Sequence, residues 1–216
     1  YFNFFSYPIS FKDIHQYLEI KISKKRLKQE LKQLISDKIV HYRHGLYTLG
    51  EYFKVKGNSE KVKRIEEAKK RVKNSEEKLN NYSFRAYIKL ISLFSQINLL
   101  GISGSVAMNN AEENDDIDLF IISSKNRLWT ARLICVIIAV LMGIKRSRRK
   151  SDSSKKVCLN LFFDETKLDI PKFKKNYYIA HEIMQMKPIV NKNNIYELFL
   201  YSNKWVCDIF PNAPLF

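Results

Sequence analysis

The chain has 216 residues, of which 45% are hydrophobic, so it can bury one sizeable core or a small and a larger one. Its 14 Phe and 12 Tyr exclude general disorder, and only 6 Gly and 5 Pro exclude collagen-like or Pro-rich low-complexity structure. The formal charge of +16 favours a polyanionic partner, nucleic acid first, over a Lys-rich surface without a specific partner.

Cysteine spacing and hydropathy indicate the cellular compartment in which the chain is expected. Cys135, Cys158 and Cys207 lie too far apart for a zinc motif or a disulfide framework, which favours a reducing, cytoplasmic environment. The strongest apolar run is LICVIIAVLMGI at 133–144, shorter than the roughly 20 residues that span a bilayer. We therefore expect a buried core helix there and no membrane partner.

Residues 1–56 carry the pattern of two short helices followed by a hairpin. Ser10 and Asp13 have the spacing of a helix cap, and Ser23 precedes a second helix with one apolar face. Residues 39–43 and 46–49 are expected to be two short strands around a turn at His44 and Gly45. This order is that of a winged helix, and we assign the segment to a winged-helix-like module.

The polar face of the second helix in this module is basic. Lysine suits phosphate or guanine contacts, so this face predicts binding of DNA or RNA. The alternative is an ordinary solvated face in a module that only contacts protein. The lysines are Lys24, Lys25, Lys28 and Lys32.

Residues 57–81 are expected to form a charged linking helix, with pairs such as Glu66 and Lys70 one turn apart. Residues 82–216 then alternate between helical and strand patterns, which predicts an α/β or α+β domain with an open sheet covered on one side. Expected strands are 99–103, 117–122 and 157–163; expected helices are 82–97, 129–143, 177–186 and 193–208, with a helix or turn at 106–110.

The segment GISGSVAMNNAEENDDIDLFII, residues 101–122, carries the chemistry. Asp116 and Asp118 flank Ile117 at the start of a strand, where period-two alternation places both carboxylates on the same face. Two carboxylates so close repel unless a cation lies between them, and Mg²⁺ (or Mn²⁺) prefers such oxygen ligands. We therefore predict a metal site at Asp116 and Asp118.

Upstream, Ser103, Gly104 and Ser105 lie where a strand is expected to turn into a helix. Backbone N–H groups and the Ser105 hydroxyl could face a polyphosphate there, with Gly104 allowing close approach. Taken singly, a Gly-Ser pair is usually a turn and Asp-x-Asp a solvated strand end. Their order and spacing together indicate a combined phosphate and metal site.

At these residues the chain resembles the nucleotidyltransferase superfamily of DNA polymerase β type, over roughly residues 82–216. The order of winged helix, linker and transferase domain also resembles a bacterial group of such proteins. The resemblance implies an α+β domain with a small mixed sheet, in which Gly104 and Ser105 hold the β- and γ-phosphates of an NTP. It further implies that Asp116 and Asp118 hold two metals for transfer of a nucleoside monophosphate to a hydroxyl on nucleic acid or protein.

Active members of the superfamily usually place a third carboxylate on a neighbouring strand. The expected strand VCLNLFF offers Asn160 there, which lacks the negative charge, while Asp164 or Glu165 could substitute if the register differs by several residues. The alternative function is therefore a catalytically weak or inactive protein that acts as a nucleic-acid-binding or regulatory factor.

Two further sets of polar residues stay open. The basic loop after the apolar helix could bind RNA, DNA or triphosphate, or be merely solvated; it includes Lys145, Arg146, Arg148 and Arg149. His181, Glu182 and Lys187 either face the nucleotide from a C-terminal helix or are ordinary surface polarity. The nucleobase, the acceptor and the oligomeric state are not indicated by the sequence.

Overall fold

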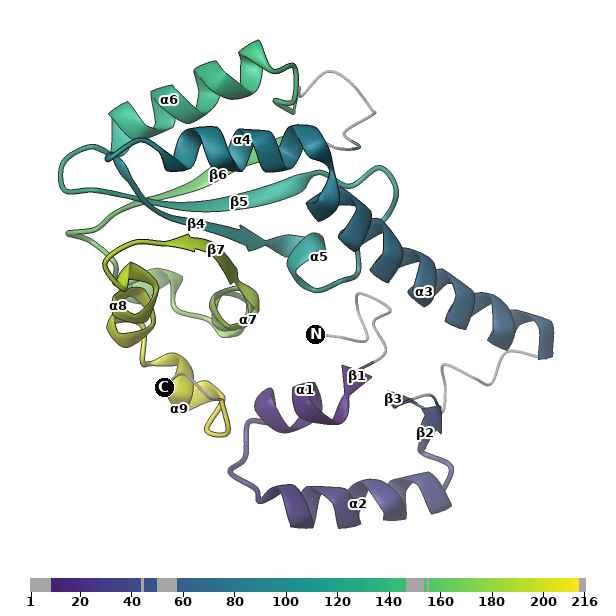
Figure 1. Ribbon diagram of the computed structural model, residues 1–216. Helices are drawn as coiled ribbons and strands as arrows, with labels where there is room; N and C mark the ends of the chain where they lie inside the picture. Colours follow the sequence, from purple (N-terminus) through teal and green to yellow (C-terminus); the bar gives the residue numbers. More distant parts are fainter. Residues whose placement is uncertain (1–8, 44, 50–57, 147–153, 155, 214–216) are drawn as a thin grey trace. The chain divides into compact units, whose positions relative to one another are not determined.

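The computed structural model describes residues 9–43, 45–49, 58–146, 154 and 156–213. The chain divides into two compact units, residues 1–70 with 204–216 and residues 71–203. The fold is mixed α+β with one small sheet in each unit (Figure 1), which confirms the α+β fold class predicted from the sequence. Within the described residues, no helix is both long and apolar enough to cross a bilayer.

The two helices of the first unit begin at the caps that the sequence indicates. Helix α1 (Phe11–Gln16) follows Ser10, whose hydroxyl oxygen accepts from the Asp13 backbone N–H at 3.1 Å. Helix α2 (Lys24–Ser36) follows Ser23, which accepts from the Arg26 N–H at 3.2 Å. Each cap satisfies a backbone donor that a helix start leaves unpaired.

A three-stranded antiparallel sheet completes this part of the first unit. Strands β2 (Val40–Arg43) and β3 (Leu46–Leu49) form the expected hairpin, and β1 (Ile9–Ser10) adds to β3 on its other edge. Gly45 lies in the turn with φ of +84°, a conformation that glycine adopts without strain. His44 of the expected turn lies outside the described residues.

The C-terminal segment belongs to the same unit as these helices, which differs from the single domain expected for 82–216. It contains the short helix α9 (Val206–Ile209). Asn212 accepts from the Ile22 N–H at 3.0 Å and donates to the Ile20 carbonyl at 2.7 Å. The buried ring of Phe210 packs edge-on against Tyr17. Such long-range pairing leaves no local sequence pattern.

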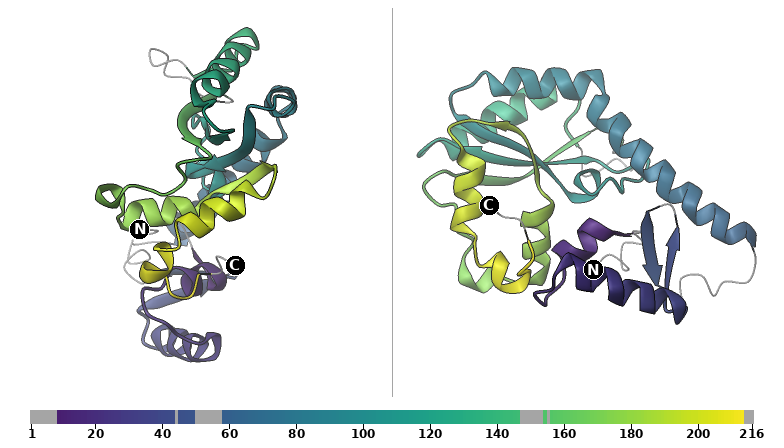
Figure 2. Two further views of the ribbon diagram at one scale, coloured as in Figure 1. Left: turned by 90° about the vertical axis from the view of Figure 1, so that its left-hand side faces the viewer. Right: turned by 60° about the horizontal axis from the view of Figure 1, so that its bottom comes forward.

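Helix α3 (Asn58–Asn80) is continuous, and its part from Arg71 onward lies in the second unit. Helix α4 (Tyr82–Ser92) starts afresh, because Asn81 leaves the helical conformation and its side chain caps the Phe84 N–H at 3.2 Å. Figure 2 shows the change of direction between the two helices.

The sheet of the second unit has the strand order β6-β5-β4-β7. Strand β4 runs antiparallel to β5 and β7, while β5 and β6 are parallel. The edge strand β7 was not expected, since it is short and mostly exposed. The strands are β4 (Ile97–Ser103), β5 (Ile117–Ser123), β6 (Val157–Asp164) and β7 (Lys187–Asn191).

Helices cover both faces of this sheet, not one as expected (Figure 1). Helices α4 and α6 (Leu128–Leu141) enclose the main core on one face. On the other face, Phe120 and Phe163 stack at 4.9 Å and contact Phe199 of α8. The remaining helices here are α5 (Gly104–Ala107), η2 (Lys172–Lys174), α7 (Tyr177–Gln185) and α8 (Ile195–Ser202).

The apolar helix α6 is not the fully buried helix that the sequence predicts. Its inner face buries the small residues Ala131, Cys135 and Ala139 against the sheet, while Leu133 and Ile137 are exposed. A helix that lies on the outside of a single sheet has only one face covered.

Candidate functional site

The two aspartates of the motif lie together at the start of β5, as period-two alternation predicts. One potential ligand atom each from Asp116, Asp118 and Cys158 all lie within 4.8 Å of one another. Cys158 comes from β6, so the cluster joins two neighbouring strands. Two carboxylates and a thiol at one point form a donor set that fits a divalent cation.

Cys158, not Asn160, occupies the place opposite the aspartates. In the parallel pairing of β5 and β6, Asp118 stands beside Cys158, and Phe120 stands beside Leu161. Strand β6 therefore has one extra residue in this interval, a β-bulge, and Asn160 lies in it with an exposed side chain. Neither the register nor the bulge can be read from the local pattern.

Asp164 lies too far along β6 to serve as the third carboxylate of this cluster. It pairs with Ser123 at the far end of β5, six residues after Cys158, which corresponds to roughly 20 Å along a strand. Its Oδ1 accepts from the Thr166 hydroxyl at 2.6 Å. Partial burial raises the pKa of Asp164, but the hydrogen bonds that its carboxylate accepts have the larger effect. The pKa therefore lies below the ordinary value.

Burial and like charge raise the pKa values of two groups in this cluster. Burial and the Asp116 charge raise the pKa of Asp118. Burial and the charge of Asp118 likewise raise the pKa of the Cys158 thiol to about 12. Arg146 offsets part of this charge by pairing with Asp116, Nη1 to Oδ2, at 2.8 Å. A cation between the carboxylates would relieve the same repulsion.

Gly104 packs directly against the Asp118 carboxylate. Its φ is +64°, and a Cβ built at this position would overlap Asp118 Oδ2. Ser103, the preceding residue, pairs with Asp118 in the antiparallel register of β4 and β5. The Gly-Ser turn and the two aspartates therefore lie at one place in the fold, whereas the sequence shows only their order along the chain.

Ser105 hydrogen-bonds to a residue that the sequence analysis did not single out. Its hydroxyl donates to Asp115 Oδ2 at 2.7 Å, and the same oxygen accepts from the Glu112 N–H at 2.9 Å. A phosphate bound by Ser105 would take the place of this carboxylate. The adjacent pair Asp115-Asp116 was the available signal, since two neighbouring acids point to different sides of an extended chain.

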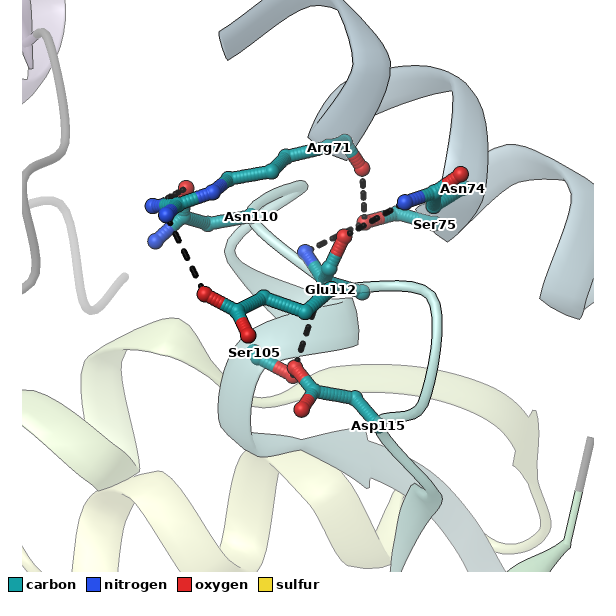
Figure 3. A network of polar contacts seen from close by, with 8 residues as sticks. Arg71, Asn74, Ser75, Ser105, Asn110, Glu112 and Asp115 are labelled. Carbon is teal, nitrogen blue, oxygen red and sulfur yellow. Dashed lines mark hydrogen bonds and ion pairs between the residues drawn. The ribbon is translucent and has the colours of Figure 1, made fainter. Parts of the chain in front are cut away.

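The end of α3 holds the loop that leads to the aspartates (Figure 3). Arg71 contacts Asn110 at 3.4 Å and Glu112 at 3.1 Å. Ser75 accepts from the Ala111 N–H at 3.0 Å, and the Asn74 amide donates to the Ala111 carbonyl at 3.2 Å. The expected linking helix therefore also shapes the site.

Lys78 adds the most buried of these contacts. Its ammonium donates to the backbone carbonyls of Glu113 at 2.8 Å and Asp115 at 2.7 Å, and the residue is only 4% exposed. Carbonyl acceptors compensate for the cost of burying the charge. Lys78 thus fixes the backbone immediately before Asp116.

Helix α7 brings Tyr178 and Glu182 towards the cluster. The Glu182 carboxylate, partial burial and the Asp118 charge all raise the pKa of Tyr178. His181 is buried instead, and its burial lowers its pKa to about 4, so the ring is neutral at pH 7. Lys187 donates to the Asn109 side chain at 3.3 Å. Of the three residues left open, His181 is therefore buried and is not ordinary surface polarity.

The basic residues expected to bind nucleic acid fall into two places. On α2, all four lysines are exposed, while Leu27 and Leu31 are buried. In the loop after α6, Lys145 is exposed and Arg146 pairs with Asp116. Arg148 and Arg149 lie outside the described residues.

Comparison of the chain with protein-family models, curated proteins and solved structures finds no match. Function must therefore be argued from the site itself.

Proposed function

We propose that the second unit binds an NTP with a divalent cation and transfers its nucleoside monophosphate to a hydroxyl acceptor on nucleic acid or protein, with pyrophosphate as the leaving group. One observation carries this proposal: Gly104 of the Gly-Ser turn packs against Asp118 of the Asp-x-Asp pair. A phosphate-binding turn in contact with a cation site is what an NTP with its metal requires.

In this proposal, different residues around the cluster bind the metal, bind the phosphates and support the loop. Asp116 and Asp118 would hold Mg²⁺ or Mn²⁺, which supplies positive charge for the phosphates and lowers the pKa of the acceptor hydroxyl. Ser103, Gly104 and Ser105 bind the β- and γ-phosphates through the turn and the Ser105 hydroxyl. Lys78 and Arg71 hold the loop before Asp116 in the required conformation.

Arg146 has a second role in this proposal. Its guanidinium forms an ion pair with Asp116, although its side chain is half exposed. If Asp116 held a cation, its charge would be neutralised, and the Arg146 side chain would become available to the triphosphate. Arginine suits this exchange because its planar group pairs with carboxylate and phosphate alike.

We further propose a specific fold for each of the two units. For the second unit, a polymerase-β-like nucleotidyltransferase domain is supported by a small mixed sheet whose metal acids open a strand just after the Gly-Ser turn. For the first unit, a winged helix is supported by the order helix, helix, hairpin. The exposed lysines of α2 would then contact a DNA or RNA acceptor.

One observation favours a second candidate function. The third member of the cluster is the Cys158 thiol, where active members of the resembled superfamily place a carboxylate. A neutral thiol adds no negative charge, so catalysis would be weak while nucleotide still binds. The chain would then act as a nucleic-acid-binding or regulatory factor.

The decisive experiment supplies each α-labelled NTP with Mg²⁺ or Mn²⁺ and total cellular RNA, and measures NTP binding and label transfer separately. Asp116→Asn combined with Asp118→Asn should abolish metal-dependent NTP binding. The control, Glu66→Gln with Glu76→Gln, removes two exposed charges from α3 and should change nothing. Binding without transfer in the unmodified protein favours the second candidate. Unchanged binding in the aspartate variant contradicts both.

A further inference from the structure

The outer face of α6 is a continuous apolar stripe without a partner among the described residues. Its large side chains recur at helical spacing and are between 47% and 81% exposed. The inner face uses small residues instead, so the helix turns its larger apolar surface outwards. The stripe consists of Trp129, Leu133, Ile137, Val140 and Leu141.

The neighbouring helix α4 also carries exposed apolar side chains. It lies beside α6 on the same face of the sheet (Figure 1), and the Tyr87 hydroxyl donates to the Cys135 carbonyl of α6 at 3.0 Å. Tyr82, Leu90 and Leu93, at and just beyond the ends of α4, are also exposed. Scattered apolar side chains are normal on a protein surface, but a contiguous stripe marks an interaction site.

The charged residues within α4, within α6 and in the segments that flank α6 are all basic, although Glu165 accepts from the Lys125 N–H and Asp116 pairs with Arg146. Residues 82–92 and 124–146 contain no Asp or Glu, although the chain has 22 acidic residues. The cations of these segments are Arg85, Lys89, Lys125, Arg127, Arg132, Lys145 and Arg146, of which Arg146 is paired with Asp116 and Arg132 lies over the Phe162 ring. An occupant of this surface must therefore be apolar where it meets the stripe and anionic around it.

Three kinds of occupant can be compared by these two requirements: a second copy of the chain, nucleic acid and an anionic bilayer. Two copies of the chain would set cations against cations across the stripe, which opposes self-association. Nucleic acid would satisfy the cations but gains nothing from exposed aliphatic side chains. An anionic bilayer satisfies both, because its headgroups attract Lys and Arg while the acyl boundary accepts Trp and Leu.

We propose that α4 and α6 form a docking surface for an anionic lipid bilayer, with the α6 stripe lying in the plane of the headgroups. Helix α6 has 14 residues, about 21 Å at 1.5 Å per residue, so it lies on the bilayer and does not cross it. This inference is independent of the proposed transfer reaction.

The test is sedimentation of the full chain with vesicles of phosphatidylcholine alone or mixed with phosphatidylglycerol. The partition coefficient should be about tenfold or more higher on the anionic vesicles, because each basic residue near such a surface contributes roughly a fivefold increase. Leu133→Glu with Ile137→Glu should remove most of this binding. The matched control is Phe173→Glu with Leu198→Glu, which places the same charges at exposed apolar positions outside the stripe and should bind normally.

Three outcomes would overturn the proposal. The first is absence of binding to anionic vesicles by the unmodified chain. The second is equal binding by the stripe variant and its control, which would mean adsorption through net charge alone. The third is a dimer in light scattering that the stripe variant dissociates, since a second copy would then cover the stripe. Because a glutamate pair could impair folding, Lys125→Glu with Arg127→Glu provides an independent variant at exposed positions, and it too should lose affinity.

Discussion

Cys158 stands directly beside Asp118 across the parallel pairing of β6 and β5, with its sulfur in the cluster formed by the two aspartates. In the proposed transfer reaction, this thiol would be the group that limits how strongly the site polarises an acceptor. Asn160, two positions further on, lies in the bulge with its side chain exposed.

Cys158→Asp should raise nucleotidyl transfer by about tenfold or more, since roughly 1.4 kcal/mol of transition-state stabilisation is sufficient for that. The measurement is the initial rate at saturating Mg²⁺ and NTP. Asn160→Asp should leave the rate unchanged, and Cys158→Ser separates loss of the thiol from gain of charge. A rate increase in Asn160→Asp alone would show that the bulge residue is the third group after all.

Gly104→Ala should abolish metal-dependent NTP binding, because the new Cβ displaces the Asp118 carboxylate. Gly143→Ala is a matched control: Gly143 has nearly the same φ, +66° against +64°, but nothing lies within 4 Å of its added Cβ. Both variants should lose about 1 kcal/mol of stability from the left-handed conformation. Titration of NTP with Mg²⁺ distinguishes them, and equal affinities would refute the contact between the turn and the metal acids.

Lys78→Met should weaken NTP binding and destabilise the second unit by about 2 kcal/mol, since two backbone carbonyls lose a charged donor. Lys73→Met is the control on the same helix. Its pair with Glu77 is exposed, so the loss should stay below about 1 kcal/mol. Urea denaturation and NTP titration measure the two effects. A loss of stability without any loss of affinity would show that the loop needs no such support.

Asp118→Asn should stabilise the metal-free protein at neutral pH while abolishing metal binding. The folded pKa of Asp118 is raised, so its contribution to stability is complete below the ordinary value of 3.8 and is lost as pH rises through the raised pKa. The gain from the substitution should therefore vanish below that value. Urea denaturation over this pH range checks the sign, with the exposed Glu76→Gln as a variant expected to show no trend.

Changing the four α2 lysines to glutamate should lower affinity for DNA and RNA, and the salt slope should fall by about one unit for each phosphate that is no longer neutralised. A control quartet of exposed lysines in other elements makes the same change in net charge; it consists of Lys69, Lys73, Lys167 and Lys172. Binding measured at several salt concentrations compares the two. Identical slopes would mean that α2 has another purpose.

Local sequence patterns determined the features that depend on neighbouring residues. The caps at Ser10 and Ser23 follow from their side chains and the apolar spacing behind them. The common direction of Asp116 and Asp118 follows from alternation along one strand. The positive φ of Gly104 suits the turn between β4 and α5 that the Gly-Ser pair indicates.

Only the tertiary structure decided which groups meet across elements. The register of β5 and β6 places Cys158 beside Asp118, ahead of the bulge, and the length of the strand removes Asp164 from the site. Ser105 meets Asp115, and Lys78 reaches the same loop from α3, because folding brings segments far apart in sequence together. The exposure of Leu133 depends likewise on a single sheet layer that covers one face of α6. Such contacts depend on register and packing, which are properties of pairs of elements and leave no periodicity in either one.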